Sequence, residues 1–115
     1  MLSIDTLKAY GANTEEGLNR CMNMEPFYLR IVGMVKDDGN FARLKQAMAA
    51  GDAKEAFEAA HALKGATGNA ALTPIFQPVS ALTELLRGQS TMPAGGECQR
   101  LTDEIMEQLE KLKAL

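Results

Sequence analysis

Apolar residues recur every three or four positions along most of this chain, which is the spacing of one face of an α-helix. The last segment shows this most clearly, because Leu101, Ile105, Leu109 and Leu112 fall on a single face. The same spacing predicts further helices, and the full set covers about residues 3–10, 14–22, 25–38, 41–50, 52–72, 78–86 and 97–113. We therefore predict an all-α fold.

Glycine and aspartate mark two predicted helix ends near the middle of the chain. Gly51 suits the position just after a helix, where the backbone turns left-handed. Asp52 suits the N-cap of the next helix, and Glu55, three residues later, completes a pair of the capping-box kind. The sequence DDGN at residues 37–40 predicts a break between two helices, with one long bent helix as the alternative.

The remaining helix ends follow from similar rules. Gly11 closes the first helix, and Thr14 is the predicted N-cap of the second. Pro74 and Pro78 are predicted to end the helix that begins at Asp52, because proline lacks the N–H that a helix interior requires. The next helix then restarts near Pro78. Short connections between amphipathic helices predict antiparallel neighbours, and hence an up-down helical bundle.

Composition narrows the class of protein. A chain of 115 residues is long enough for one domain with its own core, so we predict a single domain over residues 1–115. The net charge is −3 and the basic residues are scattered, which argues against nucleic-acid binding. No apolar run reaches membrane-spanning length, and the start MLSIDTLKAYG lacks the features of a signal peptide. We expect a cytoplasmic protein that does not act at a membrane.

Cysteine and histidine are too sparse to suggest a metal site. Cys21 and Cys98 are far apart, and the chain has one histidine, His61. These residues lack the spacing of metal ligands. We expect no metal and no other cofactor.

A helical wheel of residues 52–72 places His61 on the solvent side. Small and apolar residues form one narrow sector that we predict to be buried, namely Ala56, Ala59, Leu63, Ala66 and Ala70. His61 lies about 170° from the centre of that sector at 100° per residue. Phe57 and Gly68 share its side of the wheel, and Lys64 and Gly65 flank the same face.

These neighbours suggest a docking site around His61. Phe57 would be an exposed apolar contact, and Gly65 and Gly68, without Cβ atoms, would leave room for a partner's backbone. Lys64, three residues on, can hold its ammonium beside the imidazole. A neutral imidazole can act as a covalent nucleophile, and phosphoryl transfer needs little beyond positioning and nearby positive charge. The alternatives are an exposed histidine without function and glycines that only pack helices tightly.

The residues His61, Leu63, Lys64 and Gly65, followed by small residues, closely resemble the H-x-L-K-G motif of the histidine-containing phosphotransfer (HPt) domain of bacterial phosphorelays. The stretches GLNR, FYLR, LKQAMAAGD and AAHALKG resemble the sequence that precedes this motif in the family. The resemblance covers most of the chain up to about Leu72. It implies an antiparallel four-helix bundle with short accessory N-terminal helices.

The resemblance also implies a role for each motif residue. His61 would carry a phosphoryl group on Nε2 and exchange it with an aspartate of a response-regulator receiver domain or of a hybrid sensor histidine kinase. Lys64 would steady the phosphate, and Gly65 would give the receiver access. The protein would be a monomeric phosphocarrier rather than a kinase. It departs from the family pattern at Ala71, where a glycine is usual, and at Pro74 and Pro78.

The sequence leaves two other function classes to compare with a phosphocarrier. A conventional enzyme is disfavoured, because the sequence offers no nucleophile–base pair and no glycine-rich phosphate loop after a strand. A phosphorylation-independent adaptor that docks receiver or kinase domains is the alternative hypothesis. The combination of His61, Lys64 and Gly65 favours the phosphocarrier.

Overall fold

The computed structural model describes all of residues 1–115 and contains seven helices and no strands, so the all-α prediction is confirmed. The helices are α1 (Ile4–Tyr10), α2 (Thr14–Arg20), α3 (Glu25–Lys36), α4 (Asn40–Ala50), α5 (Ala53–Asn69), α6 (Thr73–Leu86) and α7 (Glu97–Lys113).

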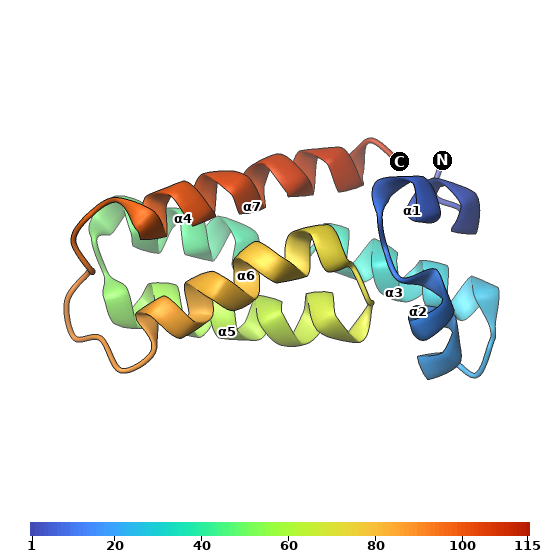
Figure 1. The fold of residues 1–115 in the computed structure, drawn as a ribbon, viewed down its shortest axis with the longest axis horizontal. Coiled ribbons are helices and arrows are strands. Elements are labelled where there is room, and N and C mark those ends of the chain that lie inside the picture. The colour runs from blue at the N-terminus through green and yellow to red at the C-terminus, as the bar shows by residue number, and fades with distance from the viewer.

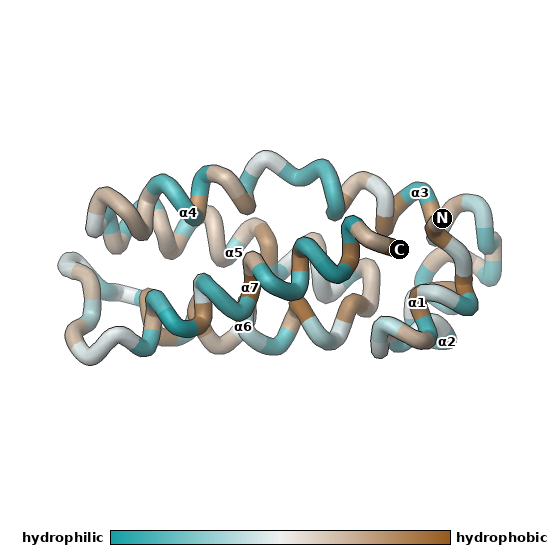
Figure 2. Tube along the Cα trace, turned by 90° about the horizontal axis from the view of Figure 1, so that it is seen from above, coloured by the Kyte–Doolittle hydropathy of each residue, from teal (hydrophilic) through white to brown (hydrophobic).

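Helices α4 to α7 form the antiparallel four-helix bundle (Figure 1). Within it α5 packs against α4 and α6, and α6 packs against α7. Helix α3 continues beyond α4 along one side, and α1 and α2 lie at the end of the molecule where α5 turns into α6 (Figure 1). The two chain termini lie close together at this same end in both views (Figures 1 and 2). The predicted bundle with accessory N-terminal helices is confirmed.

The core consists of the inward faces of these helices. All four residues predicted to face inward from α7 are buried, with at most 6% of their surface exposed. Teal and brown segments alternate along α7 in Figure 2, as expected of a helix with one polar and one apolar face. On α5 the predicted buried sector needs one correction. Ala66 is half-buried, whereas Ala60 and Thr67 are fully buried, so the apolar face is rotated towards them.

Most predicted helix ends are confirmed. Gly51 follows α4 with a left-handed backbone (φ +68°), and the Asp52 side chain accepts a hydrogen bond from the backbone N–H of Glu55. Residues 37–39 separate α3 from α4, so the chain forms two helices here. The N-cap prediction for α2 is wrong by one residue. Asn13 occupies the cap, because its side-chain oxygen accepts from the backbone N–H of Glu16.

The interpretation of the two prolines is wrong. α5 already ends at Asn69, and α6 begins at Thr73 with Pro74 in its first turn and Pro78 in its interior. Proline is tolerated in the first turn, because the N–H groups there have no partner within the helix. Pro78 removes one internal hydrogen bond from α6. The helix continues through it because Pro78 and the neighbouring Val79 are buried in the core, and tertiary packing outweighs the local cost.

The turn between α5 and α6 is the point where the N-terminal helices attach. The Tyr28 hydroxyl of α3 is buried and donates a hydrogen bond of 2.8 Å to the carbonyl oxygen of Ala70. The backbone N–H of Asn13 donates to the carbonyl oxygen of Ala71 at 2.9 Å. Ala71 itself has a left-handed backbone (φ +54°), a conformation that costs an alanine about 1–2 kcal/mol. These bonds fix the end of α5 that follows His61.

Candidate functional site

His61 lies on the exposed side of α5, as predicted. Its imidazole stacks on the ring of Phe57 one turn earlier, with ring centroids 5.4 Å apart and planes inclined by 20°. The other neighbour of Phe57 comes from the end of α6, where the Arg87 guanidinium carbon lies 5.2 Å from the ring centroid. Phe57 is therefore half-buried rather than exposed, which corrects the sequence interpretation. The stack fixes one face of the imidazole and leaves its edge open to solvent.

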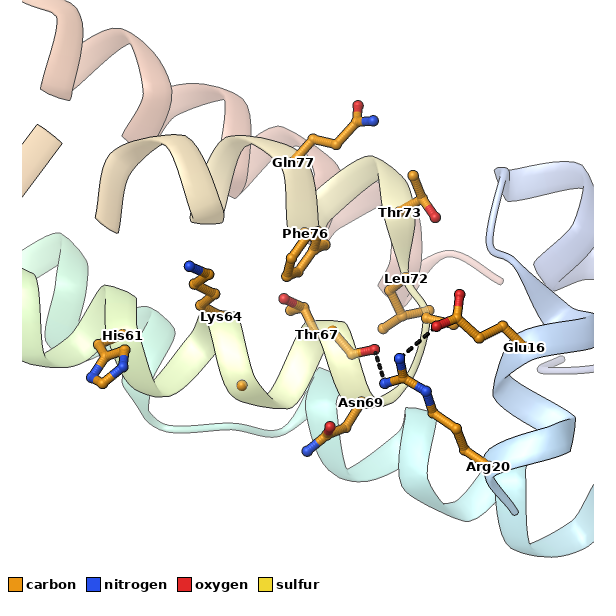
Figure 3. Close-up of a pocket in the computed structure, with 13 residues that line it drawn as sticks. Glu16, Arg20, His61, Lys64, Thr67, Asn69, Leu72, Thr73, Phe76 and Gln77 are labelled. Carbon is orange, nitrogen blue, oxygen red and sulfur yellow. Dashed lines mark hydrogen bonds and ion pairs between the residues drawn. The ribbon is translucent and has the colours of Figure 1, made fainter. Parts of the chain in front are cut away.

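Lys64 is on the same side of α5, but its ammonium group is not aimed at the imidazole. Its Nζ lies 3.3 Å from Glu84 Oε2 on α6, and Figure 3 shows the side chain directed towards α6 and away from His61. Glu84 also accepts two hydrogen bonds from Arg87, at 3.1 Å from Nε and 3.0 Å from Nη2. The hydrogen bonds from Arg87 and then from Lys64 lower the pKa of Glu84 to about 2. One carboxylate thus holds two cations, and one of them, Arg87, also contacts the Phe57 ring that stacks on His61.

The two glycines that follow His61 have opposite surroundings. A Cβ atom on Gly65 would have no heavy atom within 4 Å, so the space beside it is open as predicted. A Cβ atom on Gly68 would lie 3.0 Å from Cε1 of Phe76, because the ring of this α6 residue packs against the glycine. The prediction of open space at Gly68 is wrong. Gly68 allows tight packing of α5 on α6, which was the alternative reading of the glycines.

A groove of about 580 Å³ runs from His61 past these glycines to the N-terminal helices. Figure 3 shows Lys64, Phe76 and Gln77 on one side of it and Arg20 of α2 at its far end. The Arg20 guanidinium donates to the carbonyl oxygen of Gly68 at 2.9 Å and pairs with Glu16. The groove is lined by Glu16, Arg20, His61, Lys64, Gly65, Thr67, Gly68, Asn69, Ala71, Leu72, Thr73, Phe76 and Gln77.

Sequence reasoning missed the residues that other helices bring to this face. Glu84 and Arg87 follow Lys64 by 20 and 23 residues, and Arg20 precedes Gly68 by 48 residues. The spacing of Glu84 and Arg87 on one helix does predict their mutual ion pair. Nothing in the sequence indicates that this pair lies against Phe57 and Lys64.

The fold shows no metal-binding cluster, disulfide or membrane-spanning helix. No group of three histidine, cysteine, aspartate or glutamate side chains is arranged to hold a metal ion. Cys21 and Cys98 are both buried and unpaired, and burial raises the pKa of the Cys98 thiol. None of the seven helices has the length and apolar character to span a membrane.

Comparison with known families gives one match. The family model of the Hpt domain matches residues 38–114, which include α4 to α7 and the segment from Phe57 to Gly68. Neither the curated proteins nor the solved structures gave a match. Hpt domains are phosphocarriers in histidine phosphotransfer rather than kinases. The match covers most of the chain and agrees with the observed bundle, and we conclude that this protein belongs to the Hpt domain family.

Proposed function

We propose that this protein carries a phosphoryl group on His61 and exchanges it with the aspartates of receiver domains in a phosphorelay. One observation carries the proposal. The exposed imidazole stacks on the Phe57 ring, and the space beside the nearby Gly65 is open, within the region matched by the Hpt family. A nucleophile that attacks a phosphoryl group bound to another protein must be reachable along a straight line. The open space at Gly65 provides that approach.

The surroundings of His61 fit a carrier better than an enzyme that works alone. The stacked Phe57 ring orients the imidazole without engaging its edge. Lys64 and Arg87 supply positive charge within the same cluster, and positive charge stabilises the oxygens of a phosphoryl group in transfer. Hpt domains are phosphocarriers rather than kinases. The phosphoryl group would therefore come from another protein.

The proposed partner is a receiver domain, either of a response regulator or of a hybrid sensor histidine kinase. Phe57 and Gly65 would form the contact surface next to His61, and Gly68 is left out because Phe76 covers it. Residues 1–115 would act as one domain and as a monomer. The cytoplasmic location stays a prediction.

Transfer from a phosphorylated receiver tests the proposal. A receiver domain from the same organism, carrying radiolabelled phosphate, is mixed with the protein and with its His61→Gln variant. We expect acid-labile label on the wild-type chain and none on the variant, which should keep its helical circular dichroism because His61 is exposed. Receiver binding without transfer would contradict the proposal and support a phosphorylation-independent adaptor. Equal labelling of both proteins would exclude His61 as the carrier.

A further inference from the structure

Glu84 stands between the two cations that a phosphoryl group on His61 would attract. Its Oε2 lies 3.3 Å from Lys64 Nζ and 3.0 Å from Arg87 Nη2, so one oxygen accepts from both side chains. The same Arg87 guanidinium lies against Phe57, which in turn stacks on His61. The carboxylate, both cations, the phenyl ring and the imidazole thus form one continuous chain of contacts across α5 and α6.

A phosphoryl group would compete with Glu84 for these cations. It carries about 1.5 to 2 negative charges at pH 7 and three strong acceptor oxygens, against one charge on a carboxylate. Lys64 is one helical turn from His61, so its long side chain can reach either acceptor. The Glu84 side chain is 53% exposed, so it would be rehydrated without leaving a buried, unpaired charge. An exposed ion pair is weak enough to be exchanged in this way.

We propose that Glu84 is a positioning residue that holds Lys64 and Arg87 in the unphosphorylated protein and releases them to the phosphoryl group on His61. The inference rests on the proposed function of His61. In the transfer step the unprotonated ring nitrogen forms the N–P bond, while the P–O bond to the receiver aspartate breaks. The aspartate keeps the electron pair as a carboxylate, and the other ring nitrogen keeps its proton. Glu84 takes no part in bond making. It determines whether Lys64 and Arg87 are available to bind the phosphoryl group.

This arrangement makes the phosphorylated state less favourable than the same site would be without Glu84. Phosphorylation must break the contacts of Glu84 with Lys64 and Arg87, and it places a second negative group near the carboxylate. Loss of the carboxylate should therefore shift the transfer equilibrium towards phosphorylated His61. This shift is opposite to the one expected for a residue that stabilises the phosphorylated state, because loss of such a residue would reduce phosphorylation.

The test measures the transfer equilibrium with a radiolabelled receiver for the wild type, Glu84→Gln and Glu58→Gln. The Glu58 variant is a matched control, because Glu58 precedes His61 by one turn and pairs with Arg43 rather than with Lys64 or Arg87. Both substitutions change the net charge equally. We expect Glu84→Gln to raise the equilibrium ratio of phosphorylated to free protein about threefold, the size expected of an exposed ion pair, and Glu58→Gln to leave it nearly unchanged.

Combination with Lys64→Ala and Arg87→Ala separates release of the cations from simple charge repulsion. In a protein that lacks both cations, Glu84→Gln should lose most of its effect, as a double-mutant cycle reports for coupled residues. An unchanged ratio in Glu84→Gln, an equal rise in Glu58→Gln, or a full effect of Glu84→Gln without the cations would overturn the inference while leaving His61 phosphorylation intact. Absence of label on the wild-type chain would overturn the proposed function and the inference with it.

Discussion

The two ends of the groove on α5 differ in what neighbouring helices do to them. Near His61, the exposed side chains of Glu84 on α6 and of Arg87 just after it reach the α5 surface, and the space beside Gly65 is open. Around Gly68, the ring of Phe76 and the guanidinium of Arg20 contact α5 directly. One helix therefore has an open surface around His61 and Gly65 and, about two turns after His61, a surface at Gly68 that packs against other parts of the protein.

The difference explains why a single helix can serve two purposes. In the proposed function the His61 end exchanges contacts with each partner, which agrees with its exposed ion pairs and its open backbone at Gly65. The Gly68 end must hold the α5–α6 turn still, and it does so through buried groups such as the hydrogen bond from Tyr28 to Ala70. Substitutions should therefore affect transfer at one end and stability at the other.

The largest expected effect comes from Gly65→Leu. The bulky side chain would project into the open space beside His61 and keep a receiver from its in-line position, and a displacement of about 1 Å can cost about 100-fold in rate. Stability should be unchanged or slightly higher, because leucine favours helix over glycine. Stopped-flow or rapid-quench transfer assays measure the rate, and urea unfolding measures stability. Normal transfer by this variant would refute the role of Gly65 in access.

The same substitution at Gly68 is the natural control and should act in the opposite manner. A leucine at this position would press against the Phe76 ring. Overpacking of this kind lowers the free energy of unfolding by about 1–3 kcal/mol. Transfer by the folded fraction should remain close to that of the wild type. Should Gly68→Leu instead slow transfer without loss of stability, the division of the groove into two ends would be wrong.

A second prediction concerns Gly17, where α2 packs on Tyr28. A Cβ atom on Gly17 would overlap with ring carbons of Tyr28, whose side chain is fully buried. Gly17→Ala should lower the free energy of unfolding by about 2 kcal/mol through overpacking.

Gly33→Ala in α3 is the matched control, because nothing lies within 4 Å of its Cβ position. It should raise stability by up to about 1 kcal/mol. Similar unfolding midpoints for both variants would contradict the packing argument.

The smallest expected effect is an increase in stability when Ala71 is replaced by glycine. Its left-handed backbone (φ +54°) is one that glycine adopts without cost. Ala71→Gly should raise the free energy of unfolding by about 1 kcal/mol or less, since the greater freedom of unfolded glycine offsets part of the relief. Chemical denaturation measures the change, and a loss of stability would show that the turn is not strained by alanine.

Local features of this fold could be predicted from the sequence. The helices of α4, α5 and α7 follow from apolar spacing, and the Asp52 cap and the Gly51 end follow from rules that involve only a few adjacent residues. The exposure of His61 follows from the same helical geometry. The prolines misled the prediction because the rule against proline applies to an isolated helix. Burial of Pro78 on the inward face of α6 outweighed that rule.

The composition of the site could be predicted only in part, because half of it comes from other helices. The wheel of α5 places Gly65 and Gly68 on similar sides, and only the position of Phe76 on α6 separates them. That position depends on the turn at Ala71, whose left-handed backbone is unusual for alanine. The pairing of Lys64 with Glu84 depends on the same turn. Contacts between the two helices that such a turn joins are determined by how the helices pack, so they cannot be predicted from residue spacing along the chain.

The most direct test of the central claim observes the imidazole itself. The chain has a single histidine, so its ring gives one set of side-chain signals in a nitrogen-15 NMR spectrum. After addition of a phosphorylated receiver, we predict that these signals shift and that one ring nitrogen becomes coupled to phosphorus. Unchanged imidazole signals, with receivers from the same organism fully phosphorylated and bound, would contradict the assignment of His61 as the phosphoryl carrier.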